Sequence, residues 1–254
     1  YLFIGTRGTG KTTCARILAK AVNCEHPVDG NPCNECDACR GIEDGSVLDV
    51  VELDAASNNG VDSVRALRDE AIYSPAQVKK RVYIVDEVHM LSTPAFNALL
   101  KTLEEPPAHV IFVLCTTDPQ KILETILSRC QRFDFHRIGN EDIEHRLSYV
   151  CEQEGFDYDD EALAIVARHA KGGMRDALST LEQLSVFGNG AVHADDARSL
   201  LGEVSDQILG EFACAIAERD IAELYGLIRA QVEEGGKIEW VSGSFGSHVS
   251  YLYP

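Results

Sequence analysis

One segment near the start of the chain has the residue types and spacing of a phosphate-binding loop. Residues 5–12 read Gly-Thr-Arg-Gly-Thr-Gly-Lys-Thr and fit the pattern G-x-x-x-x-G-K-T completely. Glycines let the backbone wrap closely, so that its N–H groups point at phosphate oxygens. Lys11 would place its charge on the β- and γ-phosphates of a nucleotide, and Thr12 would offer its hydroxyl to Mg²⁺. The alternative is an ordinary glycine-rich turn between a strand and a helix. The residues predicted to bind the nucleotide are Gly5, Thr6, Arg7, Gly8, Thr9, Gly10, Lys11 and Thr12.

A second acidic segment could complete this site. The apolar run 82–85 ends in Asp86 and Glu87. A strand that ends in a carboxylate is what a P-loop enzyme uses to hold Mg²⁺, so Asp86 is the predicted metal-side acid. Glu87 could orient or deprotonate an attacking water. Because binding needs only the first acid, the pair favours hydrolysis, and a charged turn after a core strand is the alternative.

Four clustered cysteines predict a metal site. Cys24, Cys33, Cys36 and Cys39 lie within 16 residues, among turn-forming residues. Four thiolates on a loop suit tetrahedral Zn²⁺ in a structural role. An iron–sulfur cluster and disulfides or free thiols remain as alternatives, although a total of nine cysteines is odd and argues against a complete disulfide framework. The other five cysteines are interpreted as small core residues.

The elements that must position these residues alternate in the first half of the chain. Apolar runs that do not alternate with polar residues predict strands buried on both faces, and helical patterns separate them. The result is an α/β fold with a parallel sheet and helices on each side. The expected strands are 2–5, 47–53, 82–85, 110–115 and 130–135, and the expected helices are 12–22, 61–72, 94–103 and 122–127.

From residue 140 onward the strand patterns vanish and the charge changes. Residues 1–139 carry 15 basic and 19 acidic side chains, whereas residues 140–254 carry 8 and 22. This change predicts a domain boundary near residue 139, and a third segment begins near residue 205. Expected helices are 143–154, 161–171, 173–186, 195–201, 208–217 and 221–233, and the stretch 240–254 stays unassigned.

The overall composition excludes several classes of protein. The 254 residues have a formal net charge of −18, and 45% of them are apolar, which excludes a disordered or fibrous chain. A chain this acidic is not expected to bind nucleic acid non-specifically on its own. No uncharged apolar run approaches the roughly 20 residues of a membrane span, and the first residues lack the features of a signal peptide. We therefore expect a cytoplasmic protein.

Taken together, the motifs resemble those of one family. In order, the chain carries the P-loop, the four-cysteine insert, and then the segments Asp-Ala-Ala-Ser (54–57), Asp-Glu-Val-His-Met-Leu (86–91), Asn-Ala-Leu-Leu-Lys-Thr-Leu-Glu-Glu-Pro-Pro (97–107), Thr-Thr-Asp-Pro-Gln-Lys (116–121), Ser-Arg-Cys (128–130) and Gly-Gly-Met-Arg-Asp-Ala-Leu (172–178). This order closely resembles the gamma/tau subunits of bacterial DNA polymerase III, which are AAA+ clamp-loader ATPases. The resemblance covers about residues 1–235.

The resemblance implies roles for four further residues. Thr116 or Thr117 corresponds to sensor 1 near the γ-phosphate, and Arg175 to sensor 2 on the helical lid. Arg129 corresponds to an arginine finger that completes the ATP site of a neighbouring subunit in trans. Each has a plainer alternative. Arg129 could be a cation at a helix C-terminus, Arg175 could form a surface salt bridge, and the threonines could cap a strand end.

The resemblance also implies a domain layout. Residues 1–139 would form the P-loop ATPase domain with a zinc-binding insert at about 24–46, residues 140–203 a small all-α lid, and residues 204–254 the incomplete start of an all-α collar that serves oligomerisation. Family members carry a further segment before the first strand that helps to hold the adenine. Because the P-loop here begins at residue 5, we expect the chain to be a piece of a longer protein that binds ATP more weakly than an intact relative.

The function implied is that of an ATP-hydrolysing subunit that helps to open a sliding clamp and load it onto primed DNA. The implied cofactors are ATP, Mg²⁺ and structural Zn²⁺. The implied partners are other clamp-loader subunits in a ring-like oligomer, the sliding clamp, and primer–template DNA, with Arg65, Lys101 and Lys121 as candidate phosphate contacts. The alternative is a nucleotide- and zinc-binding structural subunit of the same kind of assembly without productive turnover.

Overall fold

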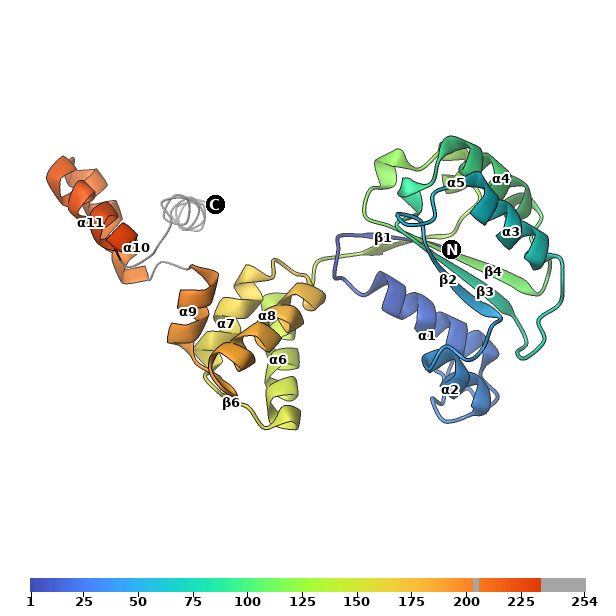
Figure 1. Ribbon diagram of the computed structural model, residues 1–254, viewed down its shortest axis with the longest axis horizontal. Helices are drawn as coiled ribbons and strands as arrows, with labels where there is room; N and C mark the ends of the chain where they lie inside the picture. The colour runs from blue at the N-terminus through green and yellow to red at the C-terminus, as the bar shows by residue number, and fades with distance from the viewer. Residues whose placement is uncertain (203–205, 234–254) are drawn as a thin grey trace. The chain divides into compact units, whose positions relative to one another are not determined.

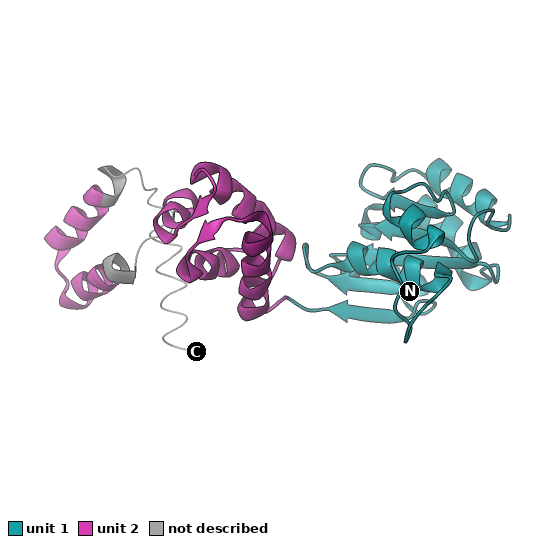
Figure 2. Ribbon diagram, turned by 90° about the horizontal axis from the view of Figure 1, so that it is seen from below, with its two compact units in different colours: residues 1–137 teal, residues 138–254 magenta. Residues whose placement is uncertain are grey.

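The computed structural model describes residues 1–202 and 206–233 of the chain. The chain divides into two compact units, Tyr1–Arg137 and Ile138–Pro254, which Figure 2 distinguishes by colour.

The first unit is built on a five-stranded parallel sheet, as the sequence predicts. Its strands lie in the order β2-β3-β4-β1-β5. Because the chain returns to the same end of the sheet after every strand, all the carboxyl ends meet at one edge. The strands are β1 (Leu2–Gly5), β2 (Val50–Asp54), β3 (Arg81–Asp86), β4 (Val110–Thr116) and β5 (Arg132–Phe135).

Helices cover both faces of this sheet (Figure 1). On one face lies α1 (Lys11–Asn23), next to α2 (Asp37–Glu43) of the cysteine-containing insert, and on the other lie α3 (Val61–Ala71), α4 (Thr93–Glu104) and α5 (Glu124–Leu127). The apolar residues of β3 alternate between two buried clusters. Val82 and Ile84 pack on the α1 side, and Tyr83 and Val85 pack on the α3–α4 side. This burial on both faces is why the strand sequences show no polar alternation.

Some strand and helix boundaries differ from those predicted from the sequence, because side-chain hydrogen bonds determine where the element begins. The strand expected at 47–53 begins instead at Val50, because Asp49 turns inward and accepts hydrogen bonds from the backbone N–H groups of Ala76 and Gln77, both at 2.8 Å. Helix α2 in the insert has no counterpart in the prediction, which expected the four cysteines to lie on a loop. Two 3₁₀ helices, η1 (Val88–Met90) and η2 (Pro119–Lys121), follow β3 and β4.

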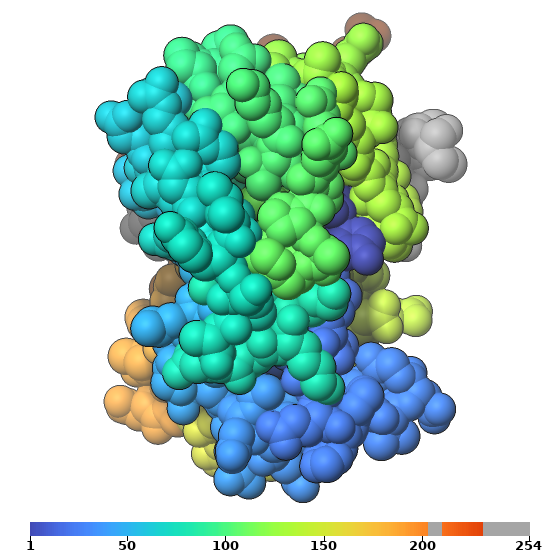
Figure 3. Space-filling model, turned by 90° about the vertical axis from the view of Figure 1, so that its right-hand side faces the viewer, coloured from blue at the N-terminus to red at the C-terminus, as the bar shows by residue number. Residues whose placement is uncertain are grey.

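Figure 3 shows the surface of the first unit. The blue residues that include the insert occupy the lower part of this view, and the teal and green residues of α3 and α4 occupy the upper part.

The second unit contains the helical bundle predicted for the lid. Its core is formed by apolar side chains that include Ile143, Leu147, Leu163, Leu181 and Leu184. The bundle helices are α6 (Asn140–Glu154), α7 (Asp160–His169), α8 (Met174–Phe187) and α9 (Ala194–Leu201).

One feature of this unit is missing from the all-helical prediction. Two short strands, β6 (Asp157–Tyr158) and β7 (Ala191–Val192), pair in parallel between the helices. Two residues are too few to show a periodic pattern, so the sequence gives no strand signal there.

Two further helices follow, α10 (Asp206–Glu218) and α11 (Ile221–Glu233), and they contact each other. The rest of the predicted collar, including the segment 240–254, lies outside the described residues. None of the described helices is long and apolar enough to cross a membrane.

Candidate functional site

The carboxyl-terminal edge of the sheet brings the predicted nucleotide residues together. The P-loop follows β1, Asp86 ends β3 and Thr116 ends β4. In the sheet register Ile4 pairs with Thr116, and Asp54 pairs with Asp86. Side chains more than a hundred residues apart in sequence thus share one edge, the place where ligands bind in open α/β sheets.

The P-loop adopts a turn that closes around its own lysine. The Nζ atom of Lys11 donates hydrogen bonds to the carbonyl oxygens of Gly5 at 2.8 Å and Thr6 at 2.9 Å, and Lys11 is only 6% exposed. Gly10 has a φ of 90°, in the left-handed region that glycine tolerates. At Gly5, an added Cβ would come within 2.5 Å of the carbonyl oxygen of Phe135. These glycines are therefore required by the backbone path as well as by phosphate access.

Thr12 and Asp86 meet across the site. The Thr12 hydroxyl donates to Oδ2 of Asp86 at 2.8 Å, and the backbone N–H of Glu87 donates to the other carboxylate oxygen at 2.9 Å. Oxygen ligands of this kind suit Mg²⁺, which binds through one or two protein oxygens, water and phosphate. The two residues predicted to hold the metal ion are therefore within direct contact of each other, at the first turn of α1 and the end of β3.

Glu87 points its carboxylate at the end of β4. Its backbone has a φ of 45°, a left-handed conformation that is uncommon for a residue with a side chain. Its Oε2 atom accepts hydrogen bonds from the hydroxyl of Thr117 at 2.8 Å and from the backbone N–H of the same residue at 3.3 Å. The turn after β3 thus aims the second acid at one of the two predicted sensor threonines.

The structure adds one residue that the sequence motifs did not assign. His89, on η1, places its Nδ1 atom 3.0 Å from the Thr116 hydroxyl and 3.4 Å from Oε2 of Glu87. Its side chain is 9% exposed, and Thr116 is fully buried. A polar residue inside the apolar segment 88–91 was the one available signal, but only the tertiary contact gives it a place in the site.

Of the two predicted arginines, Arg129 belongs to the first unit and lies outside this cluster. Arg129 ends the α5 region, where its guanidinium donates to the carbonyl oxygen of Thr125 at 2.6 Å and to Oε1 of Glu104 at 2.6 Å. It therefore occupies the position expected for a cation near a helix C-terminus. Arg175 is exposed in the first turn of α8, in the second unit.

The three basic residues named as DNA candidates are all exposed. Arg65, on α3, pairs with Asp62 at 3.2 Å, and Lys121, on η2, pairs with Asp118 at 3.1 Å. Lys101 lies on the neighbouring helix α4. Exposed pairs of this type are weak, so they leave the cations available to a phosphate group.

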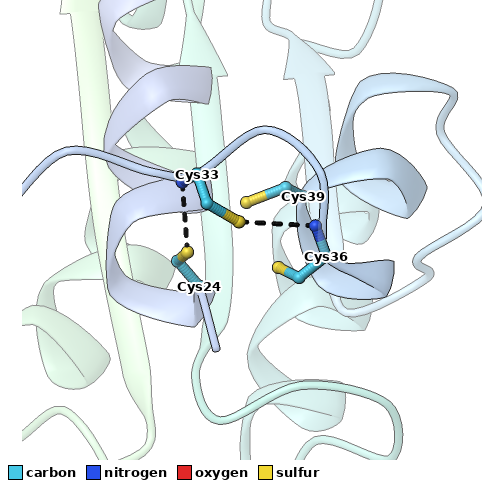
Figure 4. A group of neighbouring side chains, drawn as sticks. All are labelled: Cys24, Cys33, Cys36 and Cys39. Carbon is cyan, nitrogen blue, oxygen red and sulfur yellow. Dashed lines mark hydrogen bonds between the residues drawn. The ribbon is translucent and has the colours of Figure 1, made fainter. Parts of the chain in front are cut away.

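The four clustered cysteines converge as a metal site requires. Their Sγ atoms all lie within 4.8 Å of one another, and Figure 4 shows the sulfurs turned toward a common centre. Tetrahedral zinc with bonds of about 2.3 Å needs sulfur atoms about 3.8 Å apart, so small side-chain movements suffice. All nine cysteines, each within the described residues, are free thiols. The donor set therefore fits zinc, the ion for which four thiolates form a closed structural site.

Hydrogen bonds already favour thiolates at part of this cluster. The backbone N–H of Cys33 donates to the sulfur of Cys24 at 3.3 Å, which lowers the pKa of the Cys24 thiol, and that of Cys36 donates to the sulfur of Cys33 at 3.3 Å. Burial raises the pKa of Cys39 to about 12. A metal ion at the common centre would remove that penalty, because it binds the deprotonated form.

The insert is fastened to the loop that precedes β3. Lys79 donates to the carbonyl oxygen of Cys24 at 2.7 Å. Asn23, which is 1% exposed, exchanges hydrogen bonds with the backbone of Lys80 at 2.7 and 3.0 Å. One end of the cysteine cluster is thereby joined to the strand that carries Asp86.

Comparison with known proteins identifies the family of this chain. The family described as DNA polymerase III, delta subunit, matches residues 1–139, and that described as DNA polymerase III clamp loader subunit, ATPase lid domain, matches residues 142–190. The tau subunit of DNA polymerase III from Bacillus subtilis is 51% identical over 236 residues, which are 92% of this chain and 42% of that protein. The chain belongs to the gamma/tau clamp-loader subunit family of DNA polymerase III. The tau subunit from Escherichia coli is 45% identical over 94% of this chain and 37% of its own length.

Solved structures agree on the fold. Thermotoga maritima RuvB, a Holliday junction branch migration motor, has a TM-score of 0.57 at 13% identity, covering 99% of this chain and 79% of that one. A DNA polymerase III gamma subunit-related protein of Thermotoga maritima has a TM-score of 0.50 at 21% identity and covers 90% of this chain and 71% of its own. The chain therefore has the AAA+ fold and is homologous to ATPases, and the family resemblance seen in the motifs is confirmed. It spans about two fifths of the length of the tau relatives.

Proposed function

We propose that this chain is an ATP-hydrolysing clamp-loader subunit that helps to open a sliding clamp and load it onto primed DNA in the cytoplasm. The observation that carries the proposal is the contact between the Thr12 hydroxyl and the Asp86 carboxylate at 2.8 Å, beside Lys11 and Glu87. This arrangement supports a complete Mg²⁺–ATP site with a second acid for hydrolysis.

The P-loop residues Gly5–Thr12 would surround the phosphates with backbone N–H groups, and the N-terminus of α1 would add its positive dipole end. Lys11 would exchange its two carbonyl partners for β- and γ-phosphate oxygens. Thr12 and Asp86 would hold Mg²⁺, which neutralises charge on the phosphates. Glu87 would orient the attacking water and accept its proton. We assign sensor 1 to Thr116 or Thr117.

Two arginines would connect the site to the assembly. Arg129 would leave Glu104 and enter the ATP site of a neighbouring subunit in trans, where it stabilises charge on the transferred phosphoryl group. Arg175 would act as sensor 2 when the lid closes over the nucleotide. In this scheme ATP binding holds the ring in a clamp-opening state, and the arrival of primer–template DNA, contacted by Arg65, Lys101 and Lys121, aligns the finger and triggers release.

We further propose that the insert holds structural Zn²⁺ through Cys24, Cys33, Cys36 and Cys39. The domain division that fits this function is an ATPase domain at 1–139, with the insert at about 24–46, a lid at 140–203 and a collar segment from 204. The partners would be other clamp-loader subunits in a ring-like oligomer and the sliding clamp.

A test of the function is ATP turnover by the full-length protein assembled with its partner subunits. Sliding clamp and primed DNA should together raise the rate at least tenfold over the assembly alone. No stimulation would refute the clamp-loader proposal. Tight nucleotide binding without turnover, by contrast, would support the second candidate, a nucleotide- and zinc-binding structural subunit.

A further inference from the structure

We propose that His89 is a positioning residue for ATP hydrolysis, which fixes the hydroxyl of Thr116 as a hydrogen-bond donor and holds the carboxylate of Glu87 beside it. The inference rests on the proposed ATPase function, but nothing in that function assigns a role to His89.

The position of the ring determines which nitrogen carries its proton. Nδ1 of His89 lies 3.4 Å from Oε2 of Glu87 and 3.0 Å from the hydroxyl oxygen of Thr116. A lone pair on Nδ1 would face the carboxylate oxygen and be repelled, whereas an N–H there is attracted to both oxygens. We therefore assign the proton to Nδ1, which donates to Thr116 and is shared with Glu87.

That assignment determines the direction of the Thr116 hydroxyl. The oxygen of Thr116 also accepts the backbone N–H of Asp118 at 3.0 Å. A hydroxyl has two acceptor sites and one proton. Since His89 and Asp118 use both acceptor sites, Thr116 has to donate its proton to another group. In the proposed site, that acceptor is an anionic phosphate oxygen of the nucleotide at the edge of the sheet. Because Thr116 is fully buried, this preference is not randomised by water.

The same ring constrains the second acid. Oε2 of Glu87 is held on the other side by the Thr117 hydroxyl at 2.8 Å. His89 therefore contacts both Thr116, one of the two threonines predicted as sensor 1, and Glu87, the residue predicted to activate water. A side chain of this kind, which orients groups that act on the ligand, is typically worth 10- to 100-fold in affinity or activity, as for outer partners of metal ligands.

Isosteric substitutions separate this role from simple packing. The Nδ2 amide of asparagine can replace the Nδ1–H donor of histidine, whereas aspartate has the same shape but presents an acceptor. In the full-length protein assembled with its partners, we expect His89→Asn to keep kcat within about fivefold of the wild-type value. His89→Ala should lower kcat roughly 10- to 100-fold, and His89→Asp at least as far. The Kd for ATP and the KM should change less than about threefold in all of them.

The controls distinguish this inference from the proposed function. His109→Ala removes a partly buried histidine of the same unit, whose Nε2 contacts the carbonyl oxygen of Ala71 at 3.1 Å, and should leave kcat unchanged. Glu87→Gln reports hydrolysis itself. Wild-type turnover equal to that of Glu87→Gln refutes the ATPase function and this inference with it. Normal kcat in His89→Ala, or equal losses in the asparagine and aspartate variants, refutes the positioning role alone. ATP binding by each variant shows that it is folded.

Discussion

The buried ion pair between Asp49 and Arg81 is predicted to hold the register of β3, the strand that delivers Asp86. Oδ1 of Asp49 accepts two hydrogen bonds from the Arg81 guanidinium, at 2.6 and 3.2 Å, and Oδ2 accepts the backbone N–H groups of Ala76 and Gln77. The side chains of the pair are 4% and 16% exposed. In Asp49→Asn the amide must turn its NH₂ group toward one of these two donor sets, so one set loses its acceptor.

The cost follows from that mismatch. Removing one partner of a buried ion pair costs about 3–5 kcal/mol, because the remaining charge stays buried without compensation. Native-state hydrogen exchange of the β3 amides measures this directly. Since about 1.4 kcal/mol is tenfold, protection in Asp49→Asn should fall roughly 100- to 4,000-fold.

A matched control is available on the surface of the same unit. Asp62 also pairs with an arginine, but its side chain is 92% exposed and that of Arg65 is 56% exposed. Pairs of this kind contribute about 0.2–1 kcal/mol, so Asp62→Asn should reduce β3 protection less than about fivefold. Equal effects of the two substitutions, or unchanged protection in Asp49→Asn, would show that the buried pair does not stabilise β3.

Three further predictions concern stability in acid, zinc binding and the contacts of Arg129. The free energy of unfolding of the first unit should decrease as the pH falls, because the pKa of the Asp49 carboxyl is lower in the folded protein than its usual value. Burial raises this pKa, but the backbone N–H groups of Gln77 and Ala76 and the Arg81 guanidinium lower it by more. The stabilisation by the ionised Asp49 is fully present above the unfolded pKa of about 3.9 and is lost as the pH falls through the lower folded pKa. Acid titration monitored by circular dichroism should therefore show a smaller pH-dependent loss of stability in Asp49→Asn than in the wild type. Cys36→Ser should lower the zinc content of the reduced protein from one ion per chain to well below one, measured by metal analysis, whereas Cys214→Ser, outside the cluster, should keep one. Glu104→Gln removes the partner of Arg129 in an exposed pair, so it should change the free energy of unfolding by less than about 1 kcal/mol. Arg129→Ala, by contrast, should lower ATP turnover in the assembly by about 1,000-fold. Equal turnover in Arg129→Ala and the wild type would exclude the role of Arg129 as an arginine finger.

The strand, the P-loop and the cysteine cluster could be predicted from the sequence because each depends on residues that are close together in the chain. The strand that ends in Asp86 is an uninterrupted apolar run, because both of its faces are buried, and the P-loop glycines adopt a turn that few other residues allow. The cysteine spacing similarly anticipated four sulfurs that lie within 4.8 Å of one another.

The features that sequence missed depend on contacts between distant segments. Strand β2 begins at Val50 and not at residue 47, because Asp49 accepts hydrogen bonds from the backbone N–H groups of Ala76 and Gln77. No local sequence pattern predicts that contact. His89 belongs to the site only because η1 meets the end of β4. Arg129 was expected to act on a neighbouring chain, and its contacts in the isolated chain are with Glu104 and Thr125. A role in trans depends on atoms that a single chain does not contain.

If Thr12, Asp86 and Glu87 form a site that hydrolyses Mg²⁺–ATP, then Glu87→Gln should separate ATP binding from turnover when both are measured on the same protein. Glu87 contacts Thr117 and His89 and is not among the proposed metal ligands, so the Kd for Mg²⁺–ATP should stay within about threefold of the wild-type value. Turnover in the assembly should fall about 100- to 10,000-fold, the range lost with a general base. Turnover equal to the wild type, or ATP binding that does not depend on Mg²⁺ in either protein, would show that these residues do not form such a site.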